Sequence, residues 1–224
     1  MYEIIPSPGT DNKAFTDISK KIHLVKPFAK TIHIDIVDGE FAPHKTFMDP
    51  SPFEQFTKLN SSHEAGLKFE VHLMVKNPIE YLRPFADGGF YRFIGQIEHM
   101  PNQAEFVAEA QLVGEVALAI DKQTPVDDIA VSLEDLDSVL VMTIQAGASG
   151  QQFEDGLLEK VKELRAKSST IPIEVDGGIN DETIEAAAAA GANRFVVTSF
   201  LYSMQTPEEQ FKILQEKLQS LTVE

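Results

Sequence analysis

The 224-residue chain contains no cysteine. This absence excludes disulfide bonds, zinc–thiolate sites and a cysteine nucleophile, so any metal must bind through nitrogen or oxygen atoms. The sequence also lacks an apolar run of about 18 residues, which a membrane-spanning helix would need. Its first segment, MYEIIPSPGT, has neither the basic nor the apolar region of a secretory signal. We therefore expect a cytoplasmic protein.

Basic residues are scarce, because 19 lysines and arginines stand against 35 aspartates and glutamates, for a net charge of −16 with neutral histidines. Such a surface repels polyanions and anionic lipids, so we expect no nucleic-acid partner and no membrane partner. A small anionic ligand would need a local site that overcomes this repulsion. The hydrophobic share of 43% and the charged share of 24% are typical of globular proteins and exclude a disordered, collagen-like or coiled-coil chain.

Short β-rich runs alternate with helix-like segments along the whole chain. The expected strands are Tyr2–Ile5, Thr31–Ile36, Lys68–Met74, Tyr91–Ile97, Glu115–Ile120, Ser138–Thr143, Pro172–Asp176 and Arg194–Thr198. A spacing of about 28 residues, with a helix after each strand, suits repeated βαβ units and hence a parallel sheet. The α/β fold that eight such units form most economically is a (β/α)₈ TIM barrel, with residues 1–224 as a single domain. A doubly wound open sheet is the structural alternative.

Three helices carry readable end signals. Asn77 before Pro78 predicts an N-cap with proline at the first helical position. Thr206 and Glu209 form a capping box ahead of the last helix. Gly191 closes the alanine-rich helix DETIEAAAAA, which follows Asn180.

Four polar residues interrupt otherwise apolar strands. They are His33, Asp35, His72 and Asp176. His33 and Asp35 alternate with apolar residues, so both side chains point to the same side of their strand. A buried, unpartnered charge costs several kcal/mol, so these groups must be paired, hydrogen-bonded or coordinating. Each alone is most simply a satisfied core residue, but two imidazoles and two carboxylates together favour a site for one divalent ion such as Zn²⁺, Mn²⁺, Fe²⁺ or Co²⁺.

The remaining histidines form no comparable pattern. His23 and His63 fall in or beside helices and are expected on the solvated surface, as is His99. His44 follows the second strand, where it can face a pocket.

Three loops with glycine or small polar residues follow the last three strands: IQAGASGQQF, DGGIND and TSFLYS. In barrels, the loops after strands seven and eight often bind phosphate through backbone N–H groups and a helix N-terminus. Gly177 and Gly178 would let the backbone approach an anion closely. Glycine after a strand is also ordinary turn chemistry, so spacing alone leaves both interpretations open.

Together these segments resemble the ribulose-phosphate 3-epimerase family of ribulose-phosphate-binding barrels. HIDIVDGEFAP resembles the family's H-[IV]-D-[VI]-M-D-G-x-F-[VA]-P, and EVHLMV resembles its VHLMV. VMTIQAGASGQQF resembles VMTVNPGFGGQKF, and EVDGGIN matches E-V-D-G-G-[IV] nearly letter for letter. The resemblance extends along nearly the whole chain.

The resemblance implies a metal-dependent isomerase that interconverts D-ribulose 5-phosphate and D-xylulose 5-phosphate. It implies one divalent metal ion held by the residues that match His33, Asp35, His72 and Asp176, where it polarises the C2 carbonyl. The carboxylates that match Asp35 and Asp176 would remove and return the C3 proton on opposite faces, through an enediolate.

The resemblance also implies the contacts to a small phosphorylated sugar. The positions expected to bind substrate or phosphate are Ser7, Met74, Met142, Gly147, Ser149, Gly150, Gln151, Gly177, Gly178, Thr198 and Ser199. The sequence leaves the oligomeric state open, a homo-oligomer included.

The chain departs from the family pattern around the expected substrate. Val37 replaces a methionine, Gln96 replaces the histidine of an H-x-E element, and Thr198 replaces a glycine. The loop QAGASGQQ has lost an aromatic residue and a glycine. These departures support two alternatives: an epimerase of a different ketose phosphate, or a non-catalytic metabolite-binding barrel.

Positive charge is absent from the loops that would hold phosphate, because Gln152 stands where the family has lysine. Phosphate attraction would then depend on backbone N–H groups, a helix N-terminus and the metal. Lys45 and Lys76, after the second and third strands, are the nearest cations. We therefore expect weak electrostatic steering and a comparatively high KM.

Overall fold

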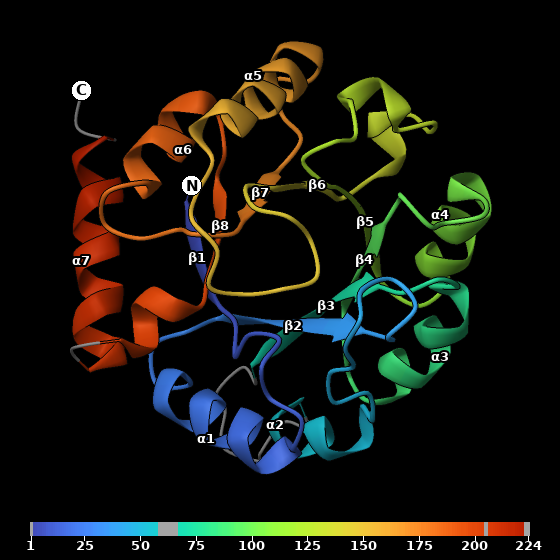
Figure 1. The fold of residues 1–224 in the computed structure, drawn as a ribbon, viewed down its shortest axis with the longest axis horizontal. Coiled ribbons are helices and arrows are strands. Elements are labelled where there is room, and N and C mark those ends of the chain that lie inside the picture. The colour runs from blue at the N-terminus through green and yellow to red at the C-terminus, as the bar shows by residue number, and fades with distance from the viewer. Residues whose placement is uncertain (1, 58–66, 204–205, 222–224) are drawn as a thin grey trace.

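Eight parallel strands form the centre of the molecule, and helices surround them (Figure 1). The computed structural model describes residues 2–57, 67–203 and 206–221. The strands are β1 (Glu3–Pro6), β2 (Thr31–Val37), β3 (Lys68–Met74), β4 (Arg92–Gln96), β5 (Glu115–Ile120), β6 (Ser138–Met142), β7 (Ile173–Asp176) and β8 (Arg194–Val197). They pair in the order β1-β8-β7-β6-β5-β4-β3-β2. The predicted strands are confirmed, with ends that differ by at most one residue.

Side chains close the sheet into a barrel between its two outermost strands, β1 and β2, which lie in contact. The Thr31 hydroxyl donates to Glu3 Oε1 at 2.7 Å near one end of this seam. Near the other end, the Ser7 hydroxyl donates to Asp35 Oδ2 at 3.1 Å. The predicted TIM barrel is therefore confirmed, and the doubly wound open sheet is wrong.

The α-helices of the described residues vary more in length than the strands, from 4 to 14 residues. They are α1 (Phe15–Val25), α2 (Glu54–Thr57), α3 (Ile79–Asp87), α4 (Gln103–Gln111), α5 (Leu158–Lys167), α6 (Ile184–Ala190) and α7 (Pro207–Ser220). None of them combines the length and the apolar composition needed to cross a bilayer.

The expectation of a helix after every strand is only partly correct. Between β5 and β6 the chain forms two short 3₁₀ turns, Val126–Asp128 and Leu133–Asp135. Extended backbone at Pro125 and Ile129 interrupts the helical geometry there. The Lys160 ammonium of α5 instead holds the start of this connection through three backbone carbonyls, at 2.6 to 2.9 Å.

Two of the predicted helix ends are confirmed and one is wrong. Thr206 and Glu209 form the capping box, and Gly191 ends α6 with φ = +117°. Helix α3 begins at Ile79, one residue later than predicted, without a side-chain cap. The Asn77 side chain donates to the Glu80 carboxylate at 2.7 Å instead of accepting from the backbone. His63 lies outside the described residues.

Alternation along each strand separates two cores. On β2, Ile32, Ile34 and Ile36 face outward into the larger core between the strands and the helices. Val37 belongs to a second apolar cluster inside the barrel, together with Met74, Ile94, Ala117, Ala119, Leu140, Met142, Ile144 and Ala146. His33 and Asp35 share the face of Val37 because side chains alternate along a strand, so they point into the barrel.

Candidate active site

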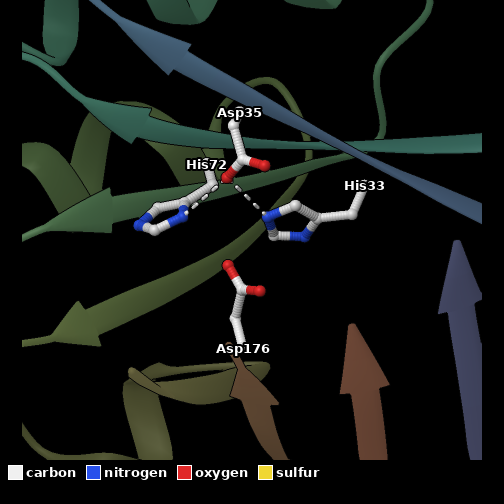
Figure 2. Close-up of side chains that lie close together, drawn as sticks. All are labelled: His33, Asp35, His72 and Asp176. Carbon is white, nitrogen blue, oxygen red and sulfur yellow. Dashed lines mark hydrogen bonds and ion pairs between the residues drawn. The ribbon is translucent and has the colours of Figure 1, made fainter. Parts of the chain in front are cut away.

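Four donor residues converge inside the barrel near the carboxyl ends of the strands (Figure 2). They are His33 and Asp35 of β2, His72 of β3 and Asp176 of β7, and one ligand atom of each lies within 4.8 Å of the others. Register explains part of this arrangement, because Asp35 pairs directly with His72. His33 Nε2 and His72 Nδ1 each lie 3.3 Å from Asp35 Oδ1, while Asp176 approaches from the opposite side.

The outward-facing nitrogen of each imidazole already has an acceptor. His33 Nδ1 donates to Glu70 Oε1 at 2.9 Å. His72 Nε2 lies 2.6 Å from Gln96 Oε1. Metal-binding histidines usually donate their second ring nitrogen in this way, which orients the other nitrogen toward the ion. Two imidazoles and two carboxylates are also the donor types that borderline divalent metals accept, so the four donors fit a metal ion.

The pKa values of the two carboxylates in the site are shifted in opposite directions. Burial and the nearby charge of Asp35 raise the pKa of Asp176 to about 7. Burial would also raise the pKa of Asp35, but the charge and hydrogen bonds of His33 and His72 hold it well below its usual range. Burial opposes protonation of His33, yet Asp35, Glu174 and Glu70 raise its pKa well above the ordinary value. The site thus retains protons that a bound cation would displace.

A buried layer of ion pairs lies beneath His33. Glu70 Oε2 accepts from Arg92 Nη1 at 3.0 Å and from Arg194 Nη2 at 2.6 Å. Glu174 Oε2 accepts from Arg194 Nε at 2.7 Å, and its other oxygen lies 3.3 Å from His33 Nδ1. His33, Glu70 and Glu174 could geometrically form a second cation site. Because guanidinium groups already neutralise both carboxylates, we assign this layer to the support of His33.

Glu70, Glu174 and the partnership of Gln96 with His72 were not predicted from the sequence. The spacing of the two glutamates could have indicated their place, because Glu70 stands two residues before His72 and Glu174 two residues before Asp176. Side chains two residues apart on a strand share one face, so both glutamates had to enter the barrel.

A pocket at the candidate site includes Asp35 and Asp176 in its lining. All but two of the predicted substrate-binding residues line it, namely Met74, Met142, Gly147, Ser149, Gly150, Gly177, Gly178, Thr198 and Ser199. Ser7 lies beneath the pocket with its side chain on Asp35. Gln151 is turned into its own loop, where its side-chain amide donates to the carbonyls of Gln145 and Ala148.

Thr10 also lines the pocket, which no sequence motif indicated. The Thr10 backbone N–H donates to Ser149 Oγ at 3.1 Å, and the Ser149 backbone N–H donates to Thr10 Oγ1 at 3.0 Å. This reciprocal pair of hydrogen bonds joins the loop after β1 to the loop after β6 over the pocket.

Positive charge is absent from the described residues that line the pocket. The Lys76 ammonium pairs with Glu40 at 2.8 Å, and Lys45 forms a backbone bridge with Asp38. Neither of the two lysines that the sequence nominated is among the residues that line the pocket.

The fold and the four donors together define a class: a (β/α)₈ barrel with a candidate nitrogen- and oxygen-ligated metal centre at the carboxyl ends of its strands. The sequence profile of the ribulose-phosphate 3 epimerase family matches residues 9–202. The ribulose-phosphate 3-epimerase of Schizosaccharomyces pombe is 36% identical over 197 residues, which cover 87% of this chain and 85% of the relative. The cytoplasmic isoform of ribulose-phosphate 3-epimerase from Oryza sativa subsp. japonica is 34% identical over 201 residues, covering 88% and 86% of the two chains. The chain belongs to the ribulose-phosphate 3-epimerase family.

Solved structures with much lower identity share the barrel. KGPDC from Streptococcus mutans superposes with a TM-score of 0.72 at 12% identity, covering 98% of both chains. Phosphoribosyl anthranilate isomerase from Thermus thermophilus superposes with a TM-score of 0.65 at 14% identity, covering 98% of this chain and 99% of that one. At such identities the likeness concerns the fold alone.

Proposed function

We propose that this chain interconverts D-ribulose 5-phosphate and D-xylulose 5-phosphate by epimerisation at C3. The observation that carries the proposal is the convergence of two imidazoles and two carboxylates under a pocket lined by glycine-rich turns. Membership of the family and the activity for which the relatives are named support the same reaction.

His33, Asp35, His72 and Asp176 would hold one divalent ion, with Zn²⁺, Mn²⁺, Fe²⁺ and Co²⁺ as the candidates that suit their donor atoms. Bound there, the ion supplies Lewis-acid chemistry that lowers the cost of negative charge on the substrate's carbonyl oxygen. Glu70 and Gln96 fix the rings of the two histidines through their outer nitrogens.

Asp35 and Asp176 are the proton-transfer groups of the proposal. They approach the centre of the site from opposite sides, as two-sided proton transfer at one carbon requires. Their environments separate their pKa values, since Asp35 is held ionised while the pKa of Asp176 is raised to about 7. These shifts belong to the metal-free site; in the reaction one carboxylate would accept the C3 proton while the other donates a proton on the other face, and the roles would exchange in the reverse direction.

The phosphate group would lie against the turns after β6, β7 and β8. Gly177 and Gly178 have φ values of +120° and +67°, and this turn brings backbone into the pocket lining. Hydroxyl groups of Ser149, Thr198 and Ser199 add hydrogen-bonding capacity. Neutral donors replace the basic side chains that the pocket lacks.

A different ketose phosphate is the second candidate, and the altered loops favour it. Ala148, Ser149 and Thr198 line the pocket, so their departures from the family pattern act on the substrate. Val37 does not line the pocket itself but shares an apolar cluster with Met74 and Met142, which do. Gln96 contacts His72 rather than the pocket. The departures in the loops therefore act on the substrate most directly.

The test uses purified protein supplied in turn with each of the four metals and a panel of pentulose and hexulose phosphates. We expect turnover with D-ribulose 5-phosphate and its loss in the Asp176→Asn variant. Preference for a hexulose phosphate would support the second candidate. If no sugar phosphate is turned over, and the Asp176→Asn variant binds the sugar phosphates as tightly as the native protein does, a non-catalytic, metabolite-binding barrel would be supported instead.

Two broader features belong to the same proposal. One domain spanning residues 1–224 is supported by the single sheet that joins β1 to β8 and β2. A cytoplasmic location is supported by the name of the rice relative.

A further inference from the structure

Gln96, the last residue of β4, lies between the candidate metal ligand His72 and the carboxylate of Glu98. Its side chain is fully buried. Gln96 Oε1 lies 2.6 Å from His72 Nε2, and Gln96 Nε2 donates to Glu98 Oε2 at 2.7 Å. The amide is thus held at both ends.

Hydrogen-bond capacity decides which end of the amide faces which neighbour. Both oxygens of Glu98 accept: Oε2 accepts from Gln96, and Oε1 accepts from the backbone N–H of Asp121 at 2.7 Å. A carboxylate has no proton to donate, so the NH₂ group of Gln96 must face Glu98. The carbonyl oxygen of Gln96 must then face His72, and His72 Nε2 must carry a hydrogen.

The backbone N–H of Asp121 in turn holds Glu98 in position. The carboxylate of Asp121 accepts from the backbone N–H of Ala146 at 2.9 Å and from the side chain of Gln145 at 3.0 Å. Its carbonyl accepts from Lys160 at 2.6 Å. Hydrogen bonds to the side chain and to the carbonyl of Asp121 therefore hold this residue, and with it the N–H that donates to Glu98, in place.

We propose that Gln96 is a positioning residue whose amide, oriented by Glu98, holds His72 with its proton on Nε2 and so selects Nδ1 as the ligand atom. The inference depends on the proposed role of His72 as a metal ligand. His33 has the opposite arrangement, because Glu70 accepts from its Nδ1 and leaves Nε2 for the site. Gln96 and Glu70 thus direct the two rings to coordinate through different nitrogens.

The amide differs chemically from the histidine that the family pattern has at this position. A neutral imidazole also offers one donor and one acceptor, but a protonated imidazole offers two donors and would oppose the N–H of His72. The side-chain amide keeps its acceptor whatever protons the site gains or loses.

The decisive variant is Glu98→Gln, which changes a residue that does not touch His72. The N–H of Asp121 still needs an oxygen, so the new amide must direct its NH₂ group toward Gln96. Gln96 must then turn its oxygen to residue 98 and its NH₂ group to His72. His72 is thereby forced to accept at Nε2 and to carry its proton on Nδ1, the atom needed for the metal.

The experiment measures ¹⁵N-labelled imidazole spectra of the metal-free and Zn²⁺-loaded protein, and the dissociation constant for Zn²⁺ by competition with a chromophoric chelator. In the native protein we expect a protonated Nε2 on His72 in both states. In Glu98→Gln we expect the proton on Nδ1 in the metal-free protein and a Zn²⁺ affinity about 10- to 100-fold weaker. The Gln96→Leu variant should weaken Zn²⁺ binding to a similar extent, and Gln96→His, which can present the same donor and acceptor, should restore it.

Gln210→Leu is the matched control, because Gln210 is also buried but its amide donates to the carbonyl of Phe200, away from the four donors. It should change the Zn²⁺ affinity by less than about twofold. An Nε2 proton and a native Zn²⁺ affinity retained in Glu98→Gln and in Gln96→Leu would overturn the inference. Failure of the native protein to bind any metal would contradict the proposed function instead, while the spectra of the metal-free protein would still test Gln96.

Discussion

Asp35 and Asp176 oppose one another across the mouth of the barrel, and the negative charge of the first, added to burial, raises the pKa of the second to about 7. Asp35 itself stays ionised because His33 and His72 lie against it. The same four groups therefore define a cation site and a pair of carboxylates with separated pKa values.

Metal affinity should fall as the pH falls through 7. Asp176 binds a metal only as a carboxylate, and its pKa of about 7 means that below this pH the metal must displace a proton. The raised pKa of His33 acts in the same direction. Titration calorimetry in two buffers of different ionisation enthalpy at pH 6 should detect at least about one proton released per Zn²⁺. An affinity that is flat from pH 5.5 to 8 would contradict this prediction.

Asp176→Asn should strongly reduce activity and yet stabilise the metal-free protein at pH 8. The pKa of Asp176 is raised from 3.8 to about 7 in the folded protein, so as the pH rises the unfolded chain loses this proton at a lower pH than the folded protein does. Stability is therefore lost as the pH rises from about 4 to about 7, and the full cost, up to about 4 kcal/mol, is present at pH 8. Removing the charge removes that cost, whereas the loss of an acid–base group should reduce kcat by about 10²- to 10⁴-fold.

Urea unfolding at pH 8 in the presence of a chelator measures the stability effect. Asp11→Asn, at an exposed aspartate outside the site, is the matched control and should leave stability and kcat unchanged. A destabilised Asp176→Asn protein would show that burial of this carboxylate is not costly.

Gly178→Ala should destabilise the protein by about 1–3 kcal/mol. The residue has φ = +67°, and an added Cβ would lie 2.8 Å from the backbone nitrogen of Phe153. Gly156→Ala is the control, because nothing lies within 4 Å of a Cβ there. Chemical denaturation should find the control within about 0.5 kcal/mol of the native protein. Equal effects of the two substitutions would argue against a conformational requirement at Gly178.

Ser149→Ala should raise KM while leaving kcat nearly unchanged. The substitution removes the oxygen that accepts from the Thr10 N–H, and with it half of the link between the two loops over the pocket. Loss of a hydrogen bond of about 0.5–1.5 kcal/mol corresponds to a rise in KM of about two- to tenfold. Ser203→Ala, which removes an exposed hydroxyl bonded to the Phe200 carbonyl, should leave KM at the native value. A matching fall in kcat would mean that Ser149 acts in the chemical step.

The reaction should depend only weakly on ionic strength, and its KM should be comparatively high. The described residues that line the pocket include no lysine or arginine, and the chain carries a net charge of −16. Long-range attraction of a sugar phosphate is therefore weak. Initial rates at low and high salt measure this, and a low KM that rises steeply with salt would contradict it.

The barrel and its four donors were predictable from sequence because both depend on local periodicity. Alternation of strand and helix patterns predicted the parallel sheet, and the two-residue spacing of His33 and Asp35 predicted a shared inward face. The reciprocal bonds of Thr10 and Ser149 join residues 139 positions apart, so no local pattern could reveal them. The expectation of a helix after β5 was wrong, because the backbone is extended at Pro125 and Ile129. The contact of Lys160, on a later helix, with the start of this connection was likewise invisible in the local sequence.

Other expectations stay predictions. A single domain over residues 1–224, the individual roles of the site residues and the identity of the metal all await measurement. Neither Lys45 nor Lys76 lines the pocket, so neither offsets the negative charge of the chain there.

The most direct test of the central claim is the reaction itself in D₂O. Metal-free protein is supplied separately with Zn²⁺, Mn²⁺, Fe²⁺ and Co²⁺ and given D-ribulose 5-phosphate. We predict that at least one metal yields D-xylulose 5-phosphate with deuterium at C3, and that Asp35→Asn and Asp176→Asn form it at least about 100-fold more slowly. Absence of D-xylulose 5-phosphate with all four metals would contradict the assignment of this chain as a C3 epimerase.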